Sequence, residues 1–164
     1  MKIYCTLLGL TMAVTAQSQI ISSEDFENGI PSGWSQTTLA TDGGWIAGDA
    51  GSLSSQSFTI PVHSIMLATN DDGCNCDKSV DFLQTESYDF SSYTGESIRI
   101  NMELFFFLGT YQGATESLEL MASVDGGSWS SINTFSGSEE WQEAIFIDIS
   151  SYAGESDVKF AFSF

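Results

Sequence analysis

The sequence predicts an all-β domain, folded as a two-sheet antiparallel β-sandwich, and three features support this prediction. Apolar and polar residues alternate with a period of two in several stretches, as in strands that bury one face. Turn-forming Gly, Asp and Ser residues separate these stretches, and no segment shows a helical period. Hydrophobic residues make up 42% of the chain, including 12 Phe, 5 Tyr and 4 Trp, which is enough to build a core.

The clearest alternation lies in the C-terminal half. Strands are expected around 98–108, 118–124, 141–149 and 158–164, with weaker ones at 24–27, 65–69 and 80–85. Asp125, Gly126, Gly127 and Ser128 mark a hairpin turn, because Gly tolerates the positive φ that tight hairpins need. The apolar face of these strands predicts a core that contains Ile100, Met102, Leu104, Leu118, Leu120, Ile145, Ile147 and Phe160.

A nine-residue motif occurs twice. The stretch 89–97 reads DFSSYTGES and the stretch 148–156 reads DISSYAGES, and an alternating strand follows each copy directly. We expect both copies to form the same corner between two strands, with Gly95 and Gly154 at the bend. The motif is too short to indicate a solenoid repeat.

The first residues read as a secretory signal peptide, residues 1–19. Lys2 supplies the positive start, 3–14 is an apolar run too short to span a bilayer, and Val14-Thr15-Ala16 is a small-residue cleavage site. Cys5 lies near the start of the apolar run and not after its end, which argues against a lipid-anchored protein. The prediction is therefore an exported protein, secreted or at the cell surface, with one domain over 20–164 and no direct membrane insertion.

The chain is strongly acidic. Its 22 Asp and Glu against 4 Lys and Arg give a formal net charge of −18. Such a surface repels phosphate backbones and anionic lipid, so nucleic acid is not expected as a partner. It attracts cations, divalent ions in particular, although adaptation to salty surroundings explains the same acidity.

The sequence offers little for catalysis. His63 is the only histidine, it lies in an expected loop beside Pro61, and no nucleophile motif is near it. Carboxylate pairs of the glycosidase type are numerous, but nothing singles out one pair. We therefore expect that the domain is not an enzyme, with a carboxylate-dependent glycosidase as the least favoured alternative.

The segment 70–81, NDDGCNCDKSVD, contains the strongest candidate site. It places Asp71, Asp72 and Asp77 around Gly73 in an expected loop, and Ca²⁺ prefers such oxygen ligands on a backbone that can wrap it. The spacing is not that of an EF-hand, and a solvated acidic turn is the alternative. Cys74 and Cys76 are disulfide candidates in an exported protein, with free or intermolecular thiols as the alternative.

An acidic and aromatic stretch follows the leader. If residues 24–27 are extended, Asp25 and Glu27 share one face and Phe26 points to the core. Trp34 and Trp45 follow Pro31-Ser32-Gly33 and Asp42-Gly43-Gly44, and we interpret them as core or loop anchors more readily than as sugar platforms.

The order of several motifs resembles the cleaved-adhesin domains of gingipains and the related choice-of-anchor J domains. The residues that carry the resemblance are DFENGIPSGW at 25–34, DGGW at 42–45, 70–85 ending in DFLQT, DGGSW at 125–129 and IDISSYAG at 147–154. Gln84 and Ser87 depart from the family's commoner choices at that point. The family implies a jelly-roll sandwich similar to MAM domains, in secreted or surface-attached multidomain bacterial proteins.

The resemblance also implies a structural Ca²⁺ ion with a ligand at Glu27. The candidate metal ligands are thus Asp25, Glu27, Asp71, Asp72 and Asp77. The resemblance further implies a noncatalytic adhesion module that binds host or matrix protein or glycan. Such a module stands beside further domains of the same polypeptide. The alternative is a glycan-binding accessory module of a secreted hydrolase, with Tyr111 or Trp129 stacking on sugars.

The chain ends at Phe164 inside an alternating stretch. The family pattern continues with one more strand. We therefore expect that the domain lacks its last strand and that 158–164 lacks one neighbour.

Overall fold

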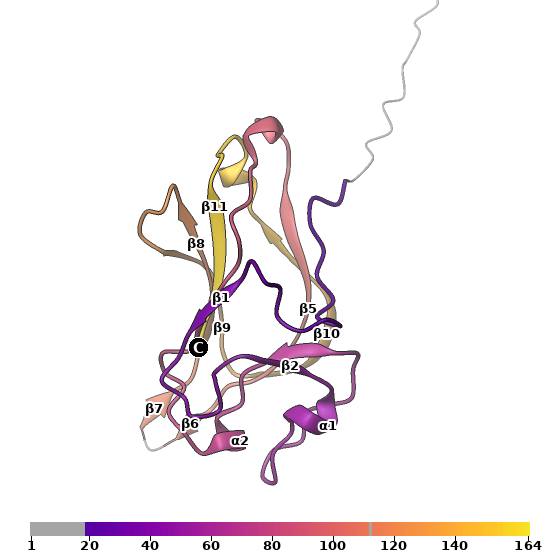
Figure 1. The fold of residues 1–164 in the computed structure, drawn as a ribbon, viewed down its shortest axis with the longest axis vertical. Coiled ribbons are helices and arrows are strands. Elements are labelled where there is room, and N and C mark those ends of the chain that lie inside the picture. Colours follow the sequence, from indigo (N-terminus) through magenta and orange to yellow (C-terminus); the bar gives the residue numbers. More distant parts are fainter. Residues whose placement is uncertain (1–18, 112) are drawn as a thin grey trace, which may run out of the picture.

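The computed structural model describes residues 19–111 and 113–164, so residues 1–18 of the expected leader lie outside it. The fold is mostly antiparallel β-structure with four short helical segments, as the sequence predicts (Figure 1). The helical segments are α1 (Ala50–Leu53), α2 (Asp71–Cys74), η1 (Ser91–Tyr93) and η2 (Ser150–Tyr152). No helix within the described ranges has the length and apolarity needed to cross a bilayer.

The larger sheet has five antiparallel strands in the order β1-β4-β11-β8-β9. Their bounds are β1 Ser35–Thr37, β4 Phe82–Gln84, β8 Leu118–Val124, β9 Ser130–Phe135 and β11 Val158–Ser163. The turn between β8 and β9 begins with Asp125 at φ 52° and Gly126 at φ 66°, as expected for a tight hairpin.

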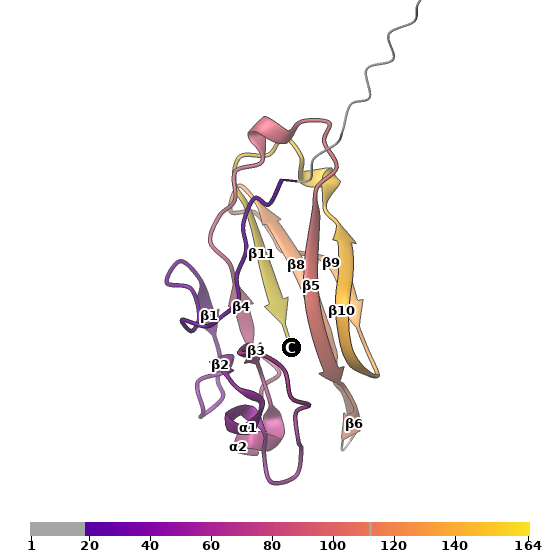
Figure 2. The same ribbon diagram turned by 90° about the vertical axis from the view of Figure 1, so that its right-hand side faces the viewer.

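A pair of long strands, β5 (Arg99–Phe107) and β10 (Ser138–Asp148), forms a second layer opposite the larger sheet (Figure 2). The register between β5 and β10 shifts twice, and the extra residues lie on β10, so β5 itself is regular. Two small pairs complete the strands: β2 (Ile46–Gly48) with β3 (Met66–Ala68), and β6 (Thr110–Tyr111) with β7 (Ala114–Thr115).

The main core lies between the two layers. Leu118, Leu120, Ile147 and Phe160 are buried, as the alternation predicts, and Ile100, Met102, Leu104 and Ile145 pack against them while remaining partly exposed. The less buried members lie on the two-stranded layer, where few neighbouring strands cover them.

The repeated motif forms two matching corners, as predicted. In each copy a carboxylate accepts from the backbone N–H two residues later, Asp89 from Ser91 and Asp148 from Ser150, both at 2.9 Å. Gly95 and Gly154 take positive φ of 80° and 104°. The corners also bond to each other, because the N–H of Gly154 donates to the carbonyl of Phe90 at 3.0 Å.

Two strand predictions were wrong. Residues 24–27 form no strand: Phe26 has φ 59°, and the side chains of Glu24 and Asp25 accept from the N–H groups of Phe26 and Glu27. Such local bonds compete with sheet pairing. Residues 158–163 do not lack a neighbour, because β11 lies between β4 and β8 and bonds to both. In the second layer, the strands with one partner are β5 and β10, which pair with each other.

Candidate functional site

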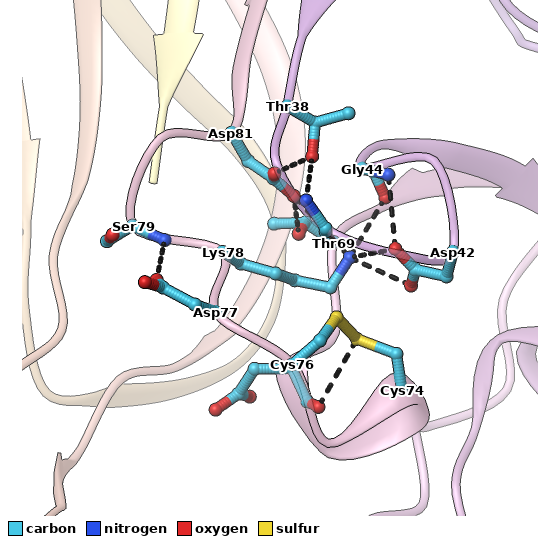
Figure 3. Close-up of a disulfide and its surroundings, with 12 residues drawn as sticks. Thr38, Asp42, Gly44, Thr69, Cys74, Cys76, Asp77, Lys78, Ser79 and Asp81 are labelled. Atoms are coloured by element: carbon cyan, nitrogen blue, oxygen red, sulfur yellow. Dashed lines mark hydrogen bonds and ion pairs between the residues drawn. A yellow bond between two sulfur atoms is a disulfide. The ribbon is translucent and has the colours of Figure 1, made fainter.

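The acidic loop 70–81 lies at one end of the molecule, and its first residues form the single-turn helix α2 (Figure 3). The sulfur atoms of Cys74 and Cys76 are joined as a disulfide, with the two Cα atoms 5.1 Å apart. Asn75 lies between them in the left-handed region at φ 49° and ends the helix, which Asn tolerates better than most residues. The disulfide therefore closes a very tight turn directly before Lys78.

Lys78 is the centre of this loop, and its side chain is fully buried. Its ammonium group lies 2.9 Å from Asp42 and 3.4 Å from Asp81, and it donates to the carbonyl of Gly44 at 3.1 Å. Burying an ammonium group is tolerated only when charges and acceptors surround it, as these three do. Lys78 thus occupies the place of a bound cation among the acids.

Asp81 is fully buried beside Lys78. One of its carboxylate oxygens accepts from the hydroxyl of Thr38. The other oxygen accepts from the hydroxyl of Thr69 at 2.9 Å and also from the ammonium group of Lys78. Residues from three separate segments, near β1, β3 and β4, therefore meet at one carboxylate.

The Asp42 side chain is 23% exposed and closes the cluster from the solvent side. Burial on its own raises the pKa of Asp42. The hydrogen bond and positive charge of Lys78, together with the N–H of Gly44, outweigh burial and hold the pKa below its usual value. Asp42 is therefore ionised at neutral pH and paired with Lys78.

The five predicted metal ligands do not come together. Asp25 and Asp77 each accept from a backbone N–H two residues later, at 3.1 Å from Glu27 and 2.9 Å from Ser79. Asp71 and Asp72 lie in the first turn of α2. Over 19–111 and 113–164, the one group of three Asp, Glu, His or Cys side chains close enough to share an ion is Asp42 with Cys74 and Cys76, whose sulfurs are bonded to each other.

These positions do not fit one calcium site built from Asp25, Glu27, Asp71, Asp72 and Asp77. Sequence reasoning missed that Lys78, Asp42 and Asp81 form the actual cluster. A signal was present, because Lys78 is one of only 4 basic residues in the chain and stands inside its most acidic segment. A lone basic residue in such a segment indicates an internal ion pair.

A second cluster lies on the face of the β5–β10 layer opposite the main core, where Phe58 and Trp141 pack against a smaller hydrophobic cluster of Ala50, Leu53, Ile60 and Met66. The ring of Phe58 lies 5.4 Å from that of Phe107 and 6.1 Å from that of Phe105, and Phe105 lies 5.8 Å from Trp141. Phe107 is 62% exposed. Together with Glu139 and Glu140, the three Phe rings line a groove of about 400 Å³, named the aromatic groove below.

Residues 105 and 107 hold outward positions of an alternating strand, where polar residues are the rule. Phe at both positions was the sequence signal for this groove. Trp45 is buried in the core, as predicted, and Trp34 is partly buried with its ring 5.8 Å from Phe26.

His63 lies beside the aromatic groove, partly buried. Its ring stacks on Trp141 with the centroids 4.2 Å apart, and Nε2 lies 3.0 Å from Glu103. The hydroxyl of Ser64 lies 2.9 Å from Nδ1. The order hydroxyl, imidazole, carboxylate is that of a hydrolase triad, but the two ring nitrogens are exchanged, since a triad serine faces Nε2 and its carboxylate faces Nδ1, and Ser64 and His63 are adjacent in one loop.

Searches against models of protein families, against curated proteins and against solved structures found no match to this chain.

Proposed function

We propose that this chain is a noncatalytic binding module of a secreted or cell-surface protein, with the jelly-roll connectivity of adhesin domains. Its partner is a protein or glycan outside the cell, and further domains of the same polypeptide carry it. The leader-like start at 1–19 supports export, and the order of motifs in 25–154 supports the adhesin assignment. Direct binding to nucleic acid is not part of this proposal, because the formal charge of −18 repels phosphate backbones. Insertion into a membrane is not part of it either, because 20–164 contains no long apolar stretch.

The observation that supports binding most directly is the aromatic groove. Large aromatic side chains are costly to expose to water. A cluster of them on a surface therefore marks a place that another molecule covers when it binds. Of the three rings, Phe107 is exposed while Phe58 and Phe105 are partly buried, and Glu139 and Glu140 add negative charge to the lining. Lys and Arg side chains suit such a site, because ring faces attract cations and carboxylates pair with them. We therefore favour a basic segment of a protein as partner.

Glycan binding remains the alternative, since sugar rings also stack on aromatic faces. Trp129 is partly buried with its ring 5.0 Å from Phe82, so it is held against β4 instead of standing free. This contact makes the aromatic groove, not Trp129, the better place for a sugar to stack.

Binding to immobilised matrix proteins and to a panel of glycans tests the proposal. Phe107→Ala is expected to weaken binding about tenfold or more, which corresponds to the loss of one well-packed contact of about 1.4 kcal/mol. Phe146→Ala is the matched control, because Phe146 is also exposed, at 54%, on the same two-stranded layer but outside the aromatic groove. Equal loss in both variants, or none in either, contradicts the role of the aromatic groove.

One observation favours a hydrolase instead, namely the order of Ser64, His63 and Glu103. A hydrolase requires that Ser64 attacks a substrate after His63 takes its proton. Hydrolysis of a simple aryl ester by the wild type, abolished by Ser64→Ala and by His63→Ala, would favour the enzyme over the binding module.

A further inference from the structure

A wide cleft separates the two layers on the side of β5. It measures about 2280 Å³, and the whole of β5 lines it, whereas β10 contributes few residues. Its lining combines the half-buried core side chains Ile100, Met102 and Leu104 of β5 with polar residues and with the chain's own segment 19–27, whereas Leu120 and Phe160 behind them are 0% and 5% exposed. The opening therefore lies along the edge of β5, and the core behind it is closely packed.

The edge of β5 that faces the cleft has unpaired backbone groups. The carbonyl of Ile98 accepts from the N–H of Ile149, and the N–H of Leu108 donates to the carbonyl of Gly137. Both bonds run toward β10 and its flanks, so the even-numbered residues of β5 direct their backbone N–H and C=O groups toward β10. Because β5 is regular, the odd-numbered residues from Arg99 to Phe107 point theirs to the other side. Within the described ranges, no strand pairs with that side.

Trp45 supplies an independent observation. Its side chain lines the same cleft and is only 8% exposed. Its indole N–H is buried and, over 19–111 and 113–164, has no hydrogen-bond acceptor. A buried donor without an acceptor costs about 1–3 kcal/mol, so the cleft lacks a polar group as well as apolar bulk.

We propose that the cleft accepts an extended segment of a partner polypeptide, which adds as a strand to the free edge of β5. Only an extended peptide offers the alternating N–H and C=O groups that complement such an edge. Its inward side chains, at alternate positions, pack beside the half-buried Ile100, Met102 and Leu104 of β5, in the cleft that Trp45 also lines. This inference goes beyond the proposed function, since it rests on the backbone edge of β5 and not on the aromatic groove, although an added strand would lie beside Phe105 and Phe107.

The chemistry of the partner follows from the register. In an antiparallel pair, residues directly opposite each other have side chains on the same face. The side chains of Asn101 and Glu103 lie on the outer face of β5, so the incoming residues opposite them also face outward. Glu103 is 53% exposed and the chain carries 22 acids against 4 bases, so basic or neutral residues suit these outward positions. The partner segment therefore alternates branched apolar residues with Lys or Thr.

A labelled nine-residue peptide, Lys-Val-Thr-Val-Lys-Val-Thr-Val-Lys, tests this by fluorescence anisotropy with the full chain. In the antiparallel register, the outward Lys and Thr residues direct their N–H groups to β5. N-methylation of the two Thr residues is expected to weaken binding about 10- to 100-fold, the loss of two backbone hydrogen bonds. N-methylation of two Val residues is the matched control, since those N–H groups point away from β5, and it should change binding little.

Asn101→Pro makes the corresponding change in the protein. It removes one N–H from the free edge, where Pro is tolerated, and leaves the bonds from β5 to β10 in place. Loss of peptide binding with an unchanged circular dichroism spectrum supports strand addition. The double change Glu139→Gln with Glu140→Gln should leave peptide binding intact, because both residues lie on β10, line the aromatic groove and do not line the cleft. Failure of this inference and failure of the proposed function are therefore distinguishable.

Three results overturn the inference. One is an absence of saturable binding to the unmethylated peptide, and another is equal loss with methylated Thr and methylated Val. The third is a dimer of the chain alone that Asn101→Pro dissolves, because a second copy then occupies the edge in place of a partner segment.

Discussion

The ammonium group of Lys78 lies 2.9 Å from the carboxylate of Asp42, although 36 residues separate them in the chain. Lys78 also faces the fully buried Asp81, so two acids and one base form a closed cluster. The cluster joins the loop after β1 to the loop before β4. It therefore ties the N-terminal part of the domain to the larger sheet.

Lys78→Met should destabilise the domain strongly. The change keeps the apolar stem but removes the charge that compensates Asp81, and an uncompensated buried charge costs about 3–5 kcal/mol. Chemical denaturation monitored by circular dichroism measures the loss. Asp77→Asn serves as the control, because Asp77 is exposed and should change the free energy of unfolding by less than about 0.5 kcal/mol. Equal stability of Lys78→Met and wild type would show that the cluster is not formed.

Stability should fall in acid because of Asp42. The folded pKa of Asp42 lies below its usual value, so the unfolded state binds the proton more readily. The contribution of Asp42 is fully present above an unfolded pKa of about 3.9, and it is lost as the pH falls through the lower folded pKa. Melting temperatures between neutral pH and pH 3 should show this loss. Asp42→Asn should flatten the acid limb, whereas Asp72→Asn, which removes the same formal charge from an exposed position, should flatten it less.

Local pattern explains what the sequence could predict. Strands β5, β8, β10 and β11 follow from alternation, and the two corners follow from the repeated motif. The segment 24–27 has the same alternation, but the side chains of Glu24 and Asp25 bond the backbone locally and replace a strand with a turn. Alternation alone does not report that competition.

Contacts distant in sequence were beyond prediction. Nothing in one sequence indicates that Asp42 meets Lys78, or that β11 lies between β4 and β8, because both depend on how loops and sheets associate. The calcium prediction rests on the spacing of acids in the sequence, and the sequence does not show that Lys78 is buried between Asp42 and Asp81. Phe105 and Phe107 are apolar residues at outward strand positions, a signal that the sequence contains but from which no groove was predicted.

The disulfide between Cys74 and Cys76 should contribute modestly to stability. It closes a loop with a sequence separation of only 2, so it restricts few conformations of the unfolded chain. The loop-entropy relation gives about 1–2 kcal/mol for so short a loop. Thiol titration before and after denaturation should find both cysteines oxidised, and the double change Cys74→Ser with Cys76→Ser should lower the melting temperature by a few degrees. Free thiols in the folded, air-exposed protein would contradict this pairing.

Gly154→Ala should destabilise the corner. Gly154 has φ 104°, where a side chain is strained, and an added Cβ lies 3.0 Å from the hydroxyl oxygen of Thr94. Strain of this kind costs about 1–3 kcal/mol. Gly73→Ala is the matched control, because its nearest neighbour is 3.8 Å from the added Cβ and the residue lies in α2, where Ala is favoured. Denaturation curves should separate the two variants, and equal stability would contradict the corner geometry.

Calcium should leave the melting temperature of this chain unchanged. An ion that binds only the native state stabilises it by mass action, so a real site would raise the melting temperature as Ca²⁺ exceeds its Kd. The arrangement around Lys78 leads to this expectation, because the ammonium group already pairs with Asp42 and Asp81, and Asp25 and Asp77 accept from nearby backbone N–H groups. The measurement is a titration with Ca²⁺ to a few millimolar, above the roughly 10⁻³ M range of weak extracellular sites.

A rise in melting temperature that a chelator reverses would restore the calcium site. The variants Glu27→Gln and Asp72→Asn would then show which of the predicted acids hold the ion. If Lys78→Met creates a calcium response that the wild type lacks, the ammonium group is confirmed as the occupant of the cation position.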